Sequence, residues 1–483
     1  MSFAKTLAAA GTAALGIPAA VLAARAANAK KELPDKRSAV SWTPEEEKIY
    51  AEKLSAMVRI PTVSKKEDEP YDDFLVLQAK LAELFPKVFS TFENHDINGN
   101  ILRLWKGSDP EKPAILFMGH QDVVPADQAD WTKDPFSGAI EDGCVWGRGA
   151  MDCKSTVCCE LQAFEELLEE GFVPKQDIWF FSARNEENSG GGSEAAAEYL
   201  KNKGIKLGLV MDEGGAIVGG MLPGIKAPVA AIGVLEKGFC NVKFTAKSAG
   251  GHSSTPPKNS PLIRLSKFMA EVDRKMPFKA ELAPPMPEIL DNLAPYMGFP
   301  LRFLLANRDV FGGLIKQAFV RISGQTRAFV QSTAAFTMAG GSSAPNVLPD
   351  EAYVICNIRP SVQQNAEQTV NVLKKIAAKY GIETEVLFSR DASNISPSDS
   401  AEFAYLKKCL NECLPDCVVT PYLMTGGTDS RRFEIVCENV LRFTPTRLTK
   451  TQIEAMHAAN ENVGISAVAE GVKIYKYLIG NRR

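Results

Sequence analysis

Three short apolar runs in this sequence are each followed by side chains that can bind a metal ion or move a proton. In chain order these are His120 and Asp122 after 114–119, Glu186 and Glu187 after 178–183, and Asp212 and Glu213 after 207–211. Apolar runs without polar alternation are typical of strands buried on both faces. Ligands of open α/β sheets bind at the carboxyl ends of such strands. We therefore expect these side chains to meet at one edge of a sheet.

A metal centre is the chemistry that this set of residues supports. Carboxylates gathered at one edge repel one another unless a cation lies between them. A glycine-bearing turn at 147–152 adds Asp152, and His457 near the C-terminus adds a second imidazole. One histidine with carboxylates can hold one zinc ion, and a second histidine makes a two-metal site feasible. Each of these segments alone could be an ordinary polar pair or a turn without a functional role. The metal interpretation is favoured because several independent segments are expected at the same edge of the sheet.

The elements around these residues predict two domains. A capping sequence predicts a helix over 44–58, and apolar spacing predicts helices over 154–170 and 194–203. Strands alternating with helices indicate an α/β fold with a mostly parallel sheet. From about 236 to 390, alternating strands and two helices predict an inserted α+β unit, although 276–330 has no clear assignment. We expect a catalytic domain over 41–235 and 391–483, with a lid or dimerisation-type domain over 236–390.

Composition narrows the protein class. Of the 483 residues, 45% are apolar and 23% are charged, which excludes a disordered chain and a polytopic membrane protein. The net charge of −3 and the lack of a long basic run argue against a nucleic-acid partner. The ten cysteines contain no CxxC pair, so we interpret most of them as buried, reduced thiols.

The N-terminus predicts export or anchoring. Residues 6–24 carry no charge and are rich in alanine, and Ala27–Ala29 resembles a signal-peptide cleavage site. A single membrane anchor is the close alternative. A loose alanine-rich helix without a targeting function is the other alternative. We expect residues 1–40 to lie outside the folded domains, and an exported or membrane-anchored protein rather than a cytoplasmic one. Reduced cysteines conflict with export, and the sequence leaves that conflict open.

A series of motifs in a fixed order carries a family resemblance. The motifs are GHQDVVP at 119–125, WTKDPFSG at 131–138, WGRGAMDCK at 146–154, NEENSGGGSE at 185–194, DEGG at 212–215, GHSSTPP at 251–257, NVLP at 346–349, NIRP at 357–360, GGTDSRRF at 426–433 and HAANE at 457–461. From about Glu45 to the C-terminus the chain resembles the co-catalytic zinc peptidases that include aminoacylase, carboxypeptidase S and related dipeptidases. The segment 333–360 is most similar to the carboxypeptidase S and N-acyl amino acid hydrolase branch.

The resemblance implies a role for each motif residue. It implies two zinc ions, with cobalt or manganese as substitutes. His120 and Asp212 would bind one zinc, Glu187 and His457 the other, and Asp152 would bridge them. Asp212 rather than Glu213 is the choice within DEGG. Asp122 would orient His120, and Glu186 would be the general base. The family usually has glycine after His457, and this chain has Ala458.

The resemblance also implies how substrate is bound. His252 and Asn346 would stabilise the oxyanion, and Arg359 would bind the substrate carboxylate, for which its planar fork is suited. The turn at Gly427 could offer backbone N–H groups to the same carboxylate. Three of the four histidines, His120, His252 and His457, are thus expected in one active site.

The predicted activity is amide hydrolysis. The substrate would be a small peptide that loses its C-terminal amino acid, or an N-acyl amino acid. The alternatives are a non-catalytic binding protein on the same scaffold and a single-metal deacetylase of the same architecture. Membrane contact through the N-terminal segment and a homodimer through the lid domain are further expectations.

Overall fold

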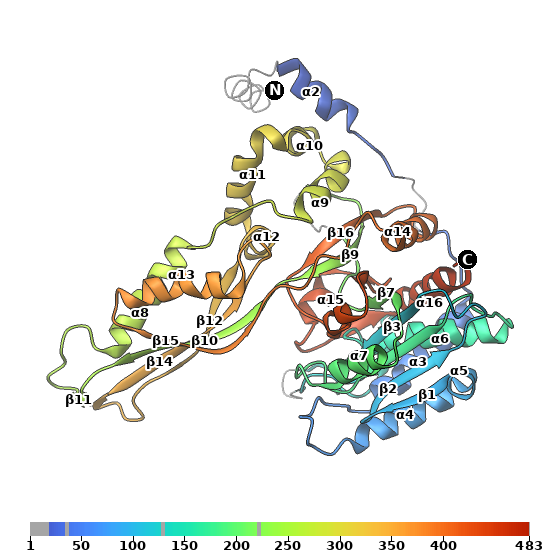
Figure 1. Ribbon diagram of the computed structural model, residues 1–483, viewed down its shortest axis with the longest axis horizontal. Coiled ribbons are helices and arrows are strands. Elements are labelled where there is room, and N and C mark those ends of the chain that lie inside the picture. Colours follow the sequence, from blue (N-terminus) through green and yellow to red (C-terminus); the bar gives the residue numbers. More distant parts are fainter. Residues whose placement is uncertain (1–18, 34–37, 127–130, 220–223, 483) are drawn as a thin grey trace.

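The computed structural model describes residues 19–33, 38–126, 131–219 and 224–482. It contains a large ten-stranded sheet and a smaller four-stranded sheet that extend in different directions (Figure 1). We call the part built on the larger sheet the large-sheet domain and the part built on the smaller sheet the lid domain. The chain leaves the large sheet after Glu236 and returns toward it after Arg390.

The large sheet has the strand order β1-β2-β6-β3-β7-β17-β9-β8-β18, with β16 paired to β9. The bounds are β1 Glu93–Ile97, β2 Asn100–Trp105, β3 Ala114–His120, β6 Ile178–Ala183, β7 Leu207–Asp212, β8 Ile217–Val218, β9 Val229–Glu236, β16 Val418–Met424, β17 Val440–Arg442 and β18 Arg447–Leu448. Strands β6, β3, β7 and β17 run parallel, and β1 and β2 add antiparallel pairs at one edge. The predicted mostly parallel sheet is confirmed.

Helices cover both faces of this sheet. They are α3 Pro44–Val58, α4 Asp72–Leu84, α5 Pro86–Thr91, α6 Lys154–Glu169, α7 Gly192–Asn202, α14 Ala401–Cys413 and α16 Ile465–Gly480, with the 3-10 helix η3 Asp429–Ile435, whereas α15 Lys450–Ala455 contacts the strand at 462–464. Strand β3 shows how one apolar run fills two cores, because its side chains alternate between faces. Ile115 and Phe117 pack with α6 and α16, whereas Leu116 and Met118 pack with α7 and η3.

A small three-stranded sheet brings distant segments together beside the large sheet. Its order is β19-β5-β4, with β4 Ala139–Glu141, β5 Cys144–Trp146 and β19 Asn462–Gly464. Asn462 pairs with Trp146, so the segment that follows His457 is held against the turn that precedes Asp152.

The lid domain is an antiparallel sheet with helices on one face. Its strand order is β12-β14-β10-β15, with β10 Phe239–Lys247, β12 Thr333–Gly340, β14 Glu351–Arg359 and β15 Glu383–Arg390. Helices α8 Pro261–Lys275 and α13 Ala366–Ala378 enclose its core. The short strands β11 Gly251–His252 and β13 Val347–Leu348 pair at the tip farthest from the large sheet (Figure 1). The predicted α+β unit is confirmed.

The unassigned stretch 276–330 is largely helical. It contains α9 Met286–Leu293, the 3-10 helix η2 Ala294–Tyr296, α10 Phe299–Ala306, α11 Arg308–Ile322 and α12 Gly324–Val330. Helix α9 packs on β16 of the large sheet, and α10 and α11 stand above it (Figure 1). We call α9 to α12 the helical block.

The N-terminal helix α2, Ala19–Asn28, packs against this helical block. Leu22 and Ala26 are fully buried there. Nε of Arg302 donates to the Ala26 carbonyl at 2.7 Å, and Nδ2 of Asn307 donates to the Leu22 carbonyl at 3.1 Å. The expectation that residues 1–40 lie outside the folded domains is therefore wrong for α2, because the helical block, far along the chain, supplies both apolar and hydrogen-bonding partners for it.

The rest of the predicted export or anchor segment, 6–18, lies outside the described residues. None of the helices in the described part of the chain combines the length and apolar character needed to cross a membrane. All ten cysteines are free, and only Cys144 is not fully buried, which confirms their interpretation as buried thiols.

Candidate metal centre and active site

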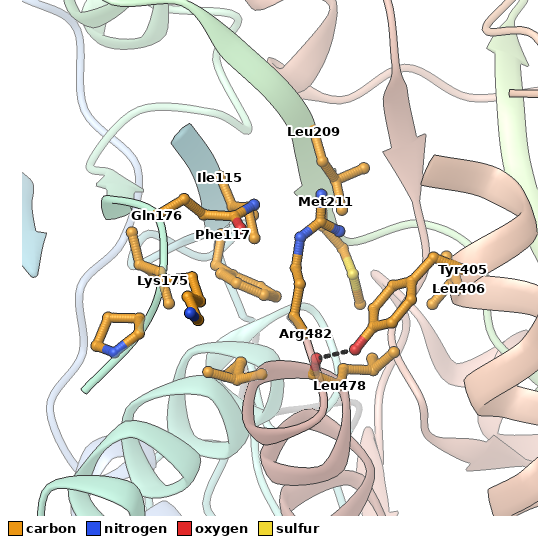
Figure 2. Close-up of a pocket in the computed structure, with 13 residues that line it drawn as sticks. Ile115, Phe117, Lys175, Gln176, Leu209, Met211, Tyr405, Leu406, Leu478 and Arg482 are labelled. Atoms are coloured by element: carbon orange, nitrogen blue, oxygen red, sulfur yellow. Dashed lines mark hydrogen bonds between the residues drawn. The ribbon is translucent and has the colours of Figure 1, made fainter. Parts of the chain in front are cut away.

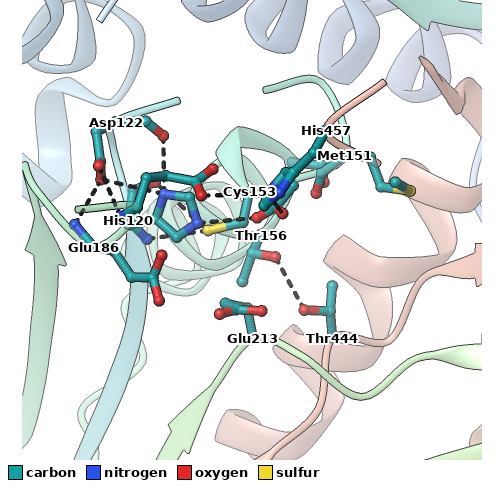
Figure 3. Close-up of polar contacts among 12 residues, drawn as sticks. His120, Asp122, Met151, Cys153, Thr156, Glu186, Glu213, Thr444 and His457 are labelled. Atoms are coloured by element: carbon teal, nitrogen blue, oxygen red, sulfur yellow. Dashed lines mark hydrogen bonds and ion pairs between the residues drawn. The ribbon is translucent and has the colours of Figure 1, made fainter. Parts of the chain in front are cut away.

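Asp152 lies between two histidines at the carboxyl edge of the large sheet. Nε2 of His120 is 3.0 Å from Oδ1 of Asp152, and Nε2 of His457 is 3.0 Å from Oδ2 (Figure 3). Oε2 of Glu187 is 3.2 Å from the same His457 nitrogen. Each oxygen of Asp152 thus faces a different imidazole, which is the arrangement that a bridging carboxylate requires.

Asp122 organises both the first histidine and the glutamate pair. Nδ1 of His120 lies 2.9 Å from the Asp122 carbonyl and 3.3 Å from its Oδ1. A proton on Nδ1 leaves Nε2 free as the ligand atom, as in carboxylate–histidine–metal arrangements. The two carboxylate oxygens of Asp122 also accept the backbone N–H groups of Glu186 and Glu187, each at 3.1 Å (Figure 3). Asp122 therefore fixes one predicted ligand and the strand end that carries two more site residues.

Glu461 holds the turn that presents Asp152, a role that sequence reasoning missed. Its carboxylate is fully buried and accepts the backbone N–H groups of Met151 and Asp152, at 2.9 and 3.1 Å. It also forms an ion pair with Arg148 at 2.7 Å. The signal in the sequence was an acidic residue in HAANE, four positions after His457.

Cys153 is a second contact that the sequence did not identify as functional. Its Sγ accepts the backbone N–H of His120 at 3.0 Å, and it lies with His120 and Asp152 in a group whose ligand atoms are all within 4.8 Å of one another. Burial raises the pKa of the Cys153 thiol well above its usual range. In the absence of a metal it is therefore a neutral thiol that helps position His120.

Asp212 is placed differently from the other predicted ligands. Its Oδ1 accepts the N–H of Glu213 and its Oδ2 accepts the N–H of Ser430, both at 2.9 Å. Neither of the two potential metal-binding groups among the described residues contains Asp212. Glu213 lies beside the cluster (Figure 3), and it lines an adjacent cavity together with Asp152 and Thr444. The assignment of Asp212 rather than Glu213 stays a prediction.

The electrostatics of the cluster show an excess of carboxylates. Hydrogen bonds to Asp152 and Glu187 raise the pKa of His457 to about 10. Burial opposes protonation of His120, but hydrogen bonds to the carboxylates of Asp122 and Asp152 favour it, and the pKa of His120 lies well above the usual value. Protonated histidines thus supply positive charge between the carboxylates. A divalent cation would supply the same charge, and binding it would release those protons.

The residues present fit such a cation. Oε1 of Glu187 is buried and has no hydrogen-bond partner among the described residues, although Oε2 faces His457. A buried carboxylate oxygen without a donor is unfavourable, and a metal ion would satisfy it. Imidazole nitrogen and carboxylate oxygen are the donors that zinc accepts in catalytic sites.

Glu186 differs from its neighbour Glu187 in position, although both side chains are largely buried. Burial raises the pKa of Glu186 well above the usual glutamate value, and the Asp429 and Glu213 carboxylates add to this effect. Its side chain belongs to neither of the potential metal-binding groups, whereas Glu187 belongs to one. The backbone bonds to Asp122 hold the two side chains in these different positions.

The structure separates the predicted substrate residues from the metal cluster. His252 and Asn346 are joined at the lid tip, where the Ser253 N–H donates to the Asn346 carbonyl at 3.1 Å. That tip is the part of the lid farthest from the large sheet (Figure 1). Within one chain only His120 and His457 meet, so the expectation that His252 shares their site stays a prediction. The sequence could not show how far the inserted domain extends.

Arg359 and Gly427 lie nearer the large-sheet domain. Arg359 ends β14 where the lid domain adjoins the large-sheet domain, a region that we call the hinge and that contains the two connections after Glu236 and Arg390. The guanidinium carbon of Arg359 lies 4.5 Å from the centre of the Phe239 ring. Gly427 lies in the exposed part of the turn between β16 and η3. The buried Glu236 carboxylate anchors this turn by accepting the Thr428 hydroxyl at 2.8 Å.

A second pocket in the large-sheet domain has a different character. It is lined mainly by apolar side chains from β3, β7 and α16, including Ile115, Leu209 and Leu478, with Arg482 at its side (Figure 2). Ile115 lies near the start of β3, whereas His120 ends that strand. The pocket therefore lies toward the amino ends of the parallel strands, whereas the metal cluster lies at their carboxyl ends. It contains none of the candidate catalytic residues.

The fold and this order of site residues match a known family. The model of peptidase family M20/M25/M40 matches residues 116–481 of the chain. The chain belongs to this family. The M20 assignment confirms the resemblance found in the sequence and makes the protein a hydrolase of a metal-dependent family.

Among characterised relatives, the chain is similar to two kinds of M20 enzyme. It is 31% identical over 456 residues to human N-fatty-acyl-amino acid synthase/hydrolase PM20D1, covering 91% of this chain and 89% of that protein. It is 27% identical over 489 residues to carboxypeptidase S of Saccharomyces cerevisiae, covering 89% of this chain and 83% of that protein.

Solved structures support the M20 fold. The M20 metallo-carboxypeptidase Sso-CP2 of Sulfolobus solfataricus superimposes with a TM-score of 0.66 at 17% identity, covering 89% of this chain and 98% of that one. Human carnosine dipeptidase 1 gives a TM-score of 0.62 at 16% identity, covering 90% and 96%. At these identities the likeness extends to the fold, a catalytic domain with a lid domain.

Proposed function

We propose that this M20 protein is a two-zinc amide hydrolase that cleaves N-acyl amino acids or releases the C-terminal amino acid of small peptides. The observation that carries the proposal is Asp152, whose two oxygens face His120 and His457 at 3.0 Å each. Relatives named for hydrolysis of N-fatty-acyl amino acids and for carboxypeptidase activity support the substrate class.

The proposed metal ligands are the residues of this cluster together with Asp212. His120 and Asp152 would hold one zinc ion, with Asp212 as the proposed third ligand, and Asp152, Glu187 and His457 would hold the other. Bound zinc lowers the pKa of water toward neutrality and polarises a carbonyl group. Cobalt or manganese, which accept similar ligands, would be substitutes.

Glu186 is the proposed general base. Its carboxylate takes a proton from the attacking water and can then pass it to the leaving amine. A base with a raised pKa suits this double role, because it must accept a proton and release it within one turnover. Asp122 positions Glu186 through the backbone N–H bond at 3.1 Å.

Asp212 and Glu213 can be separated by metal analysis. If Asp212 is the ligand, Asp212→Asn should lower the bound metal toward one ion per chain, and Glu213→Gln should leave it near two. The matched amide variants remove one charge each from neighbouring positions, so their comparison is direct. The reverse pattern would assign the ligand to Glu213 instead. The measurement is metal content per purified chain.

Arg359 is proposed to bind the substrate carboxylate. Arg359→Lys keeps the charge but loses the planar fork, so substrate binding should weaken, with KM as the measurement. Replacing the substrate carboxylate with a carboxamide should lower wild-type kcat/KM much more than it lowers that of the variant. An equal decrease in both proteins would show that Arg359 does not bind the substrate carboxylate.

The function is tested by a substrate panel that crosses dipeptides with N-acyl amino acids of increasing acyl length, assayed with zinc present. Release of the free amino acid is the expected result. A non-catalytic binding protein would bind members of the panel and release nothing. A single-metal deacetylase would be active with one metal ion per chain, so metal content is measured on the same sample.

A homodimer through the lid domain is the further part of this proposal. The site of one chain lacks His252 and Asn346, which the resemblance assigns to the oxyanion, and a second copy could supply them. The edge strand β15 exposes Val386, Leu387 and Phe388, an apolar surface typical of an interface. Light scattering should then give the mass of two chains, and a monomeric mass for active enzyme would contradict it.

A further inference from the structure

Arg390 lies at the hinge, where the chain returns from the lid domain to the large-sheet domain. It is the last residue of β15 and pairs with Phe239, the first residue of β10. On the other side of β10, β14 ends in Arg359, whose guanidinium lies above the Phe239 ring. Directly paired side chains of antiparallel strands lie on one face. Arg359, Phe239 and Arg390 therefore form a row across three strand ends.

The guanidinium of Arg390 has unused hydrogen-bonding capacity. Its Nε is buried and has no hydrogen-bond partner among the residues that the structure describes. A Cβ atom added at Gly427 would lie 3.4 Å from Nη2 of Arg390. Arg390 thus extends from the lid to the glycine turn of the large-sheet domain, the turn whose amides are expected to face the substrate carboxylate.

The buried carboxylate at this hinge already has other partners. Oε1 of Glu236 accepts Nε of Arg442 and the Thr428 hydroxyl, both at 2.8 Å. Its Oε2 lies 3.7 Å from Arg431. Oε2 accepts no hydrogen bond from the described residues, and no carboxylate among them forms a salt bridge with Arg390, although the charge of Glu236 acts on Arg390 from a longer distance.

We propose that Arg390 is a specificity-determining residue that binds the substrate carboxylate together with Arg359. This inference rests on the proposed function and names a residue that the motifs do not contain. A carboxylate has two oxygens with about four acceptor sites, so it can bind two guanidinium groups at once. Phe239 lies between the two arginines in this row, paired with Arg390 and in contact with the guanidinium of Arg359.

The position of Arg390 also gives this contact a second effect. Arg390 belongs to a lid strand, whereas Gly427 belongs to the large-sheet domain. A carboxylate held by both would connect the two domains across the hinge. Binding of an acid would therefore fix the lid orientation, whereas binding of the corresponding amide would not.

The experiment compares Arg390→Met and Arg390→Lys with wild type on one N-acyl amino acid and on its carboxamide. For the acid, Arg390→Met should raise KM about 10- to 100-fold, the range expected for losing hydrogen bonds to a charged group, with little change in kcat. The KM of Arg390→Lys for the acid should lie between the KM of wild type and that of Arg390→Met. For the carboxamide, kcat/KM should not change. The matched control is Arg274→Met, an exposed arginine on α8 of the same domain, which should leave both substrates unaffected.

Binding measurements separate this inference from the proposed function. Calorimetry in the Glu186→Gln background measures affinity for the uncleaved acid, and the Arg390→Met change should weaken it while thermal unfolding stays unchanged. An equal loss for acid and carboxamide, or no loss for either, would overturn the role of Arg390. If wild type cleaves neither substrate but Arg390→Met still weakens binding of the acid alone, the proposed hydrolysis fails and the carboxylate role stands. Failure of wild type to bind the acid would overturn both.

Discussion

The Glu186→Gln variant is expected to turn over substrate about 10²- to 10⁴-fold more slowly than wild type while keeping its full metal content. Glutamine preserves size and polarity but cannot accept the proton of the attacking water. The backbone N–H of residue 186 would still donate to Asp122, so the strand end should not move. The measurement is kcat beside metal content on the same preparation.

Glu187→Gln is the matched control, because it makes the same chemical change one residue away. Oε2 of Glu187 lies 3.2 Å from Nε2 of His457, within a potential metal-binding group. This variant should therefore lose metal together with activity. Loss of metal from Glu186→Gln with retention in Glu187→Gln would mean that the roles are exchanged. Unchanged turnover in both variants would remove the glutamate pair from the mechanism.

Removal of metal should abolish activity altogether. A chelator is expected to reduce turnover to the limit of detection, and zinc, cobalt or manganese should restore part of it. The fold should persist, because the core of the large-sheet domain consists of many side chains that are not metal ligands, such as Phe164, Phe180 and Tyr475. Circular dichroism and turnover measured together test both statements. Full activity in protein shown to contain no metal would contradict the two-zinc proposal.

The central sheet was predictable from the sequence because its strands are continuous apolar runs. Buried strands such as β3 and β6 have no exposed face, so their runs stand out from the surrounding polar chain. The helical block was not predictable in this way. Prolines at the starts of α9 and α10 resemble helix breakers in a sequence, although proline is favoured in the first turn of a helix.

The candidate site was predictable to the extent that strand ends define it. His120, Asp152, Glu187 and His457 come together as expected. The role of Glu461 could not be predicted, because its partners are backbone N–H groups some 310 positions earlier in the chain. The distance of His252 from the cluster could not be predicted either, because it depends on the length and direction of the lid strands.

Helix α2 bears on how the N-terminus would be matured. Cleavage after Ala29 would remove the carbonyl oxygens of Leu22 and Ala26, which are acceptors for Asn307 and Arg302. Asn307 is fully buried and Arg302 is 7% exposed while α2 is in place, so removing α2 would take one acceptor from each and expose to water the apolar surface that Leu22 and Ala26 cover. Exposing apolar surface costs about 25 cal/mol per Å². A processed chain would thus be less stable than one that retains α2, whereas an uncleaved anchor would leave these contacts in place.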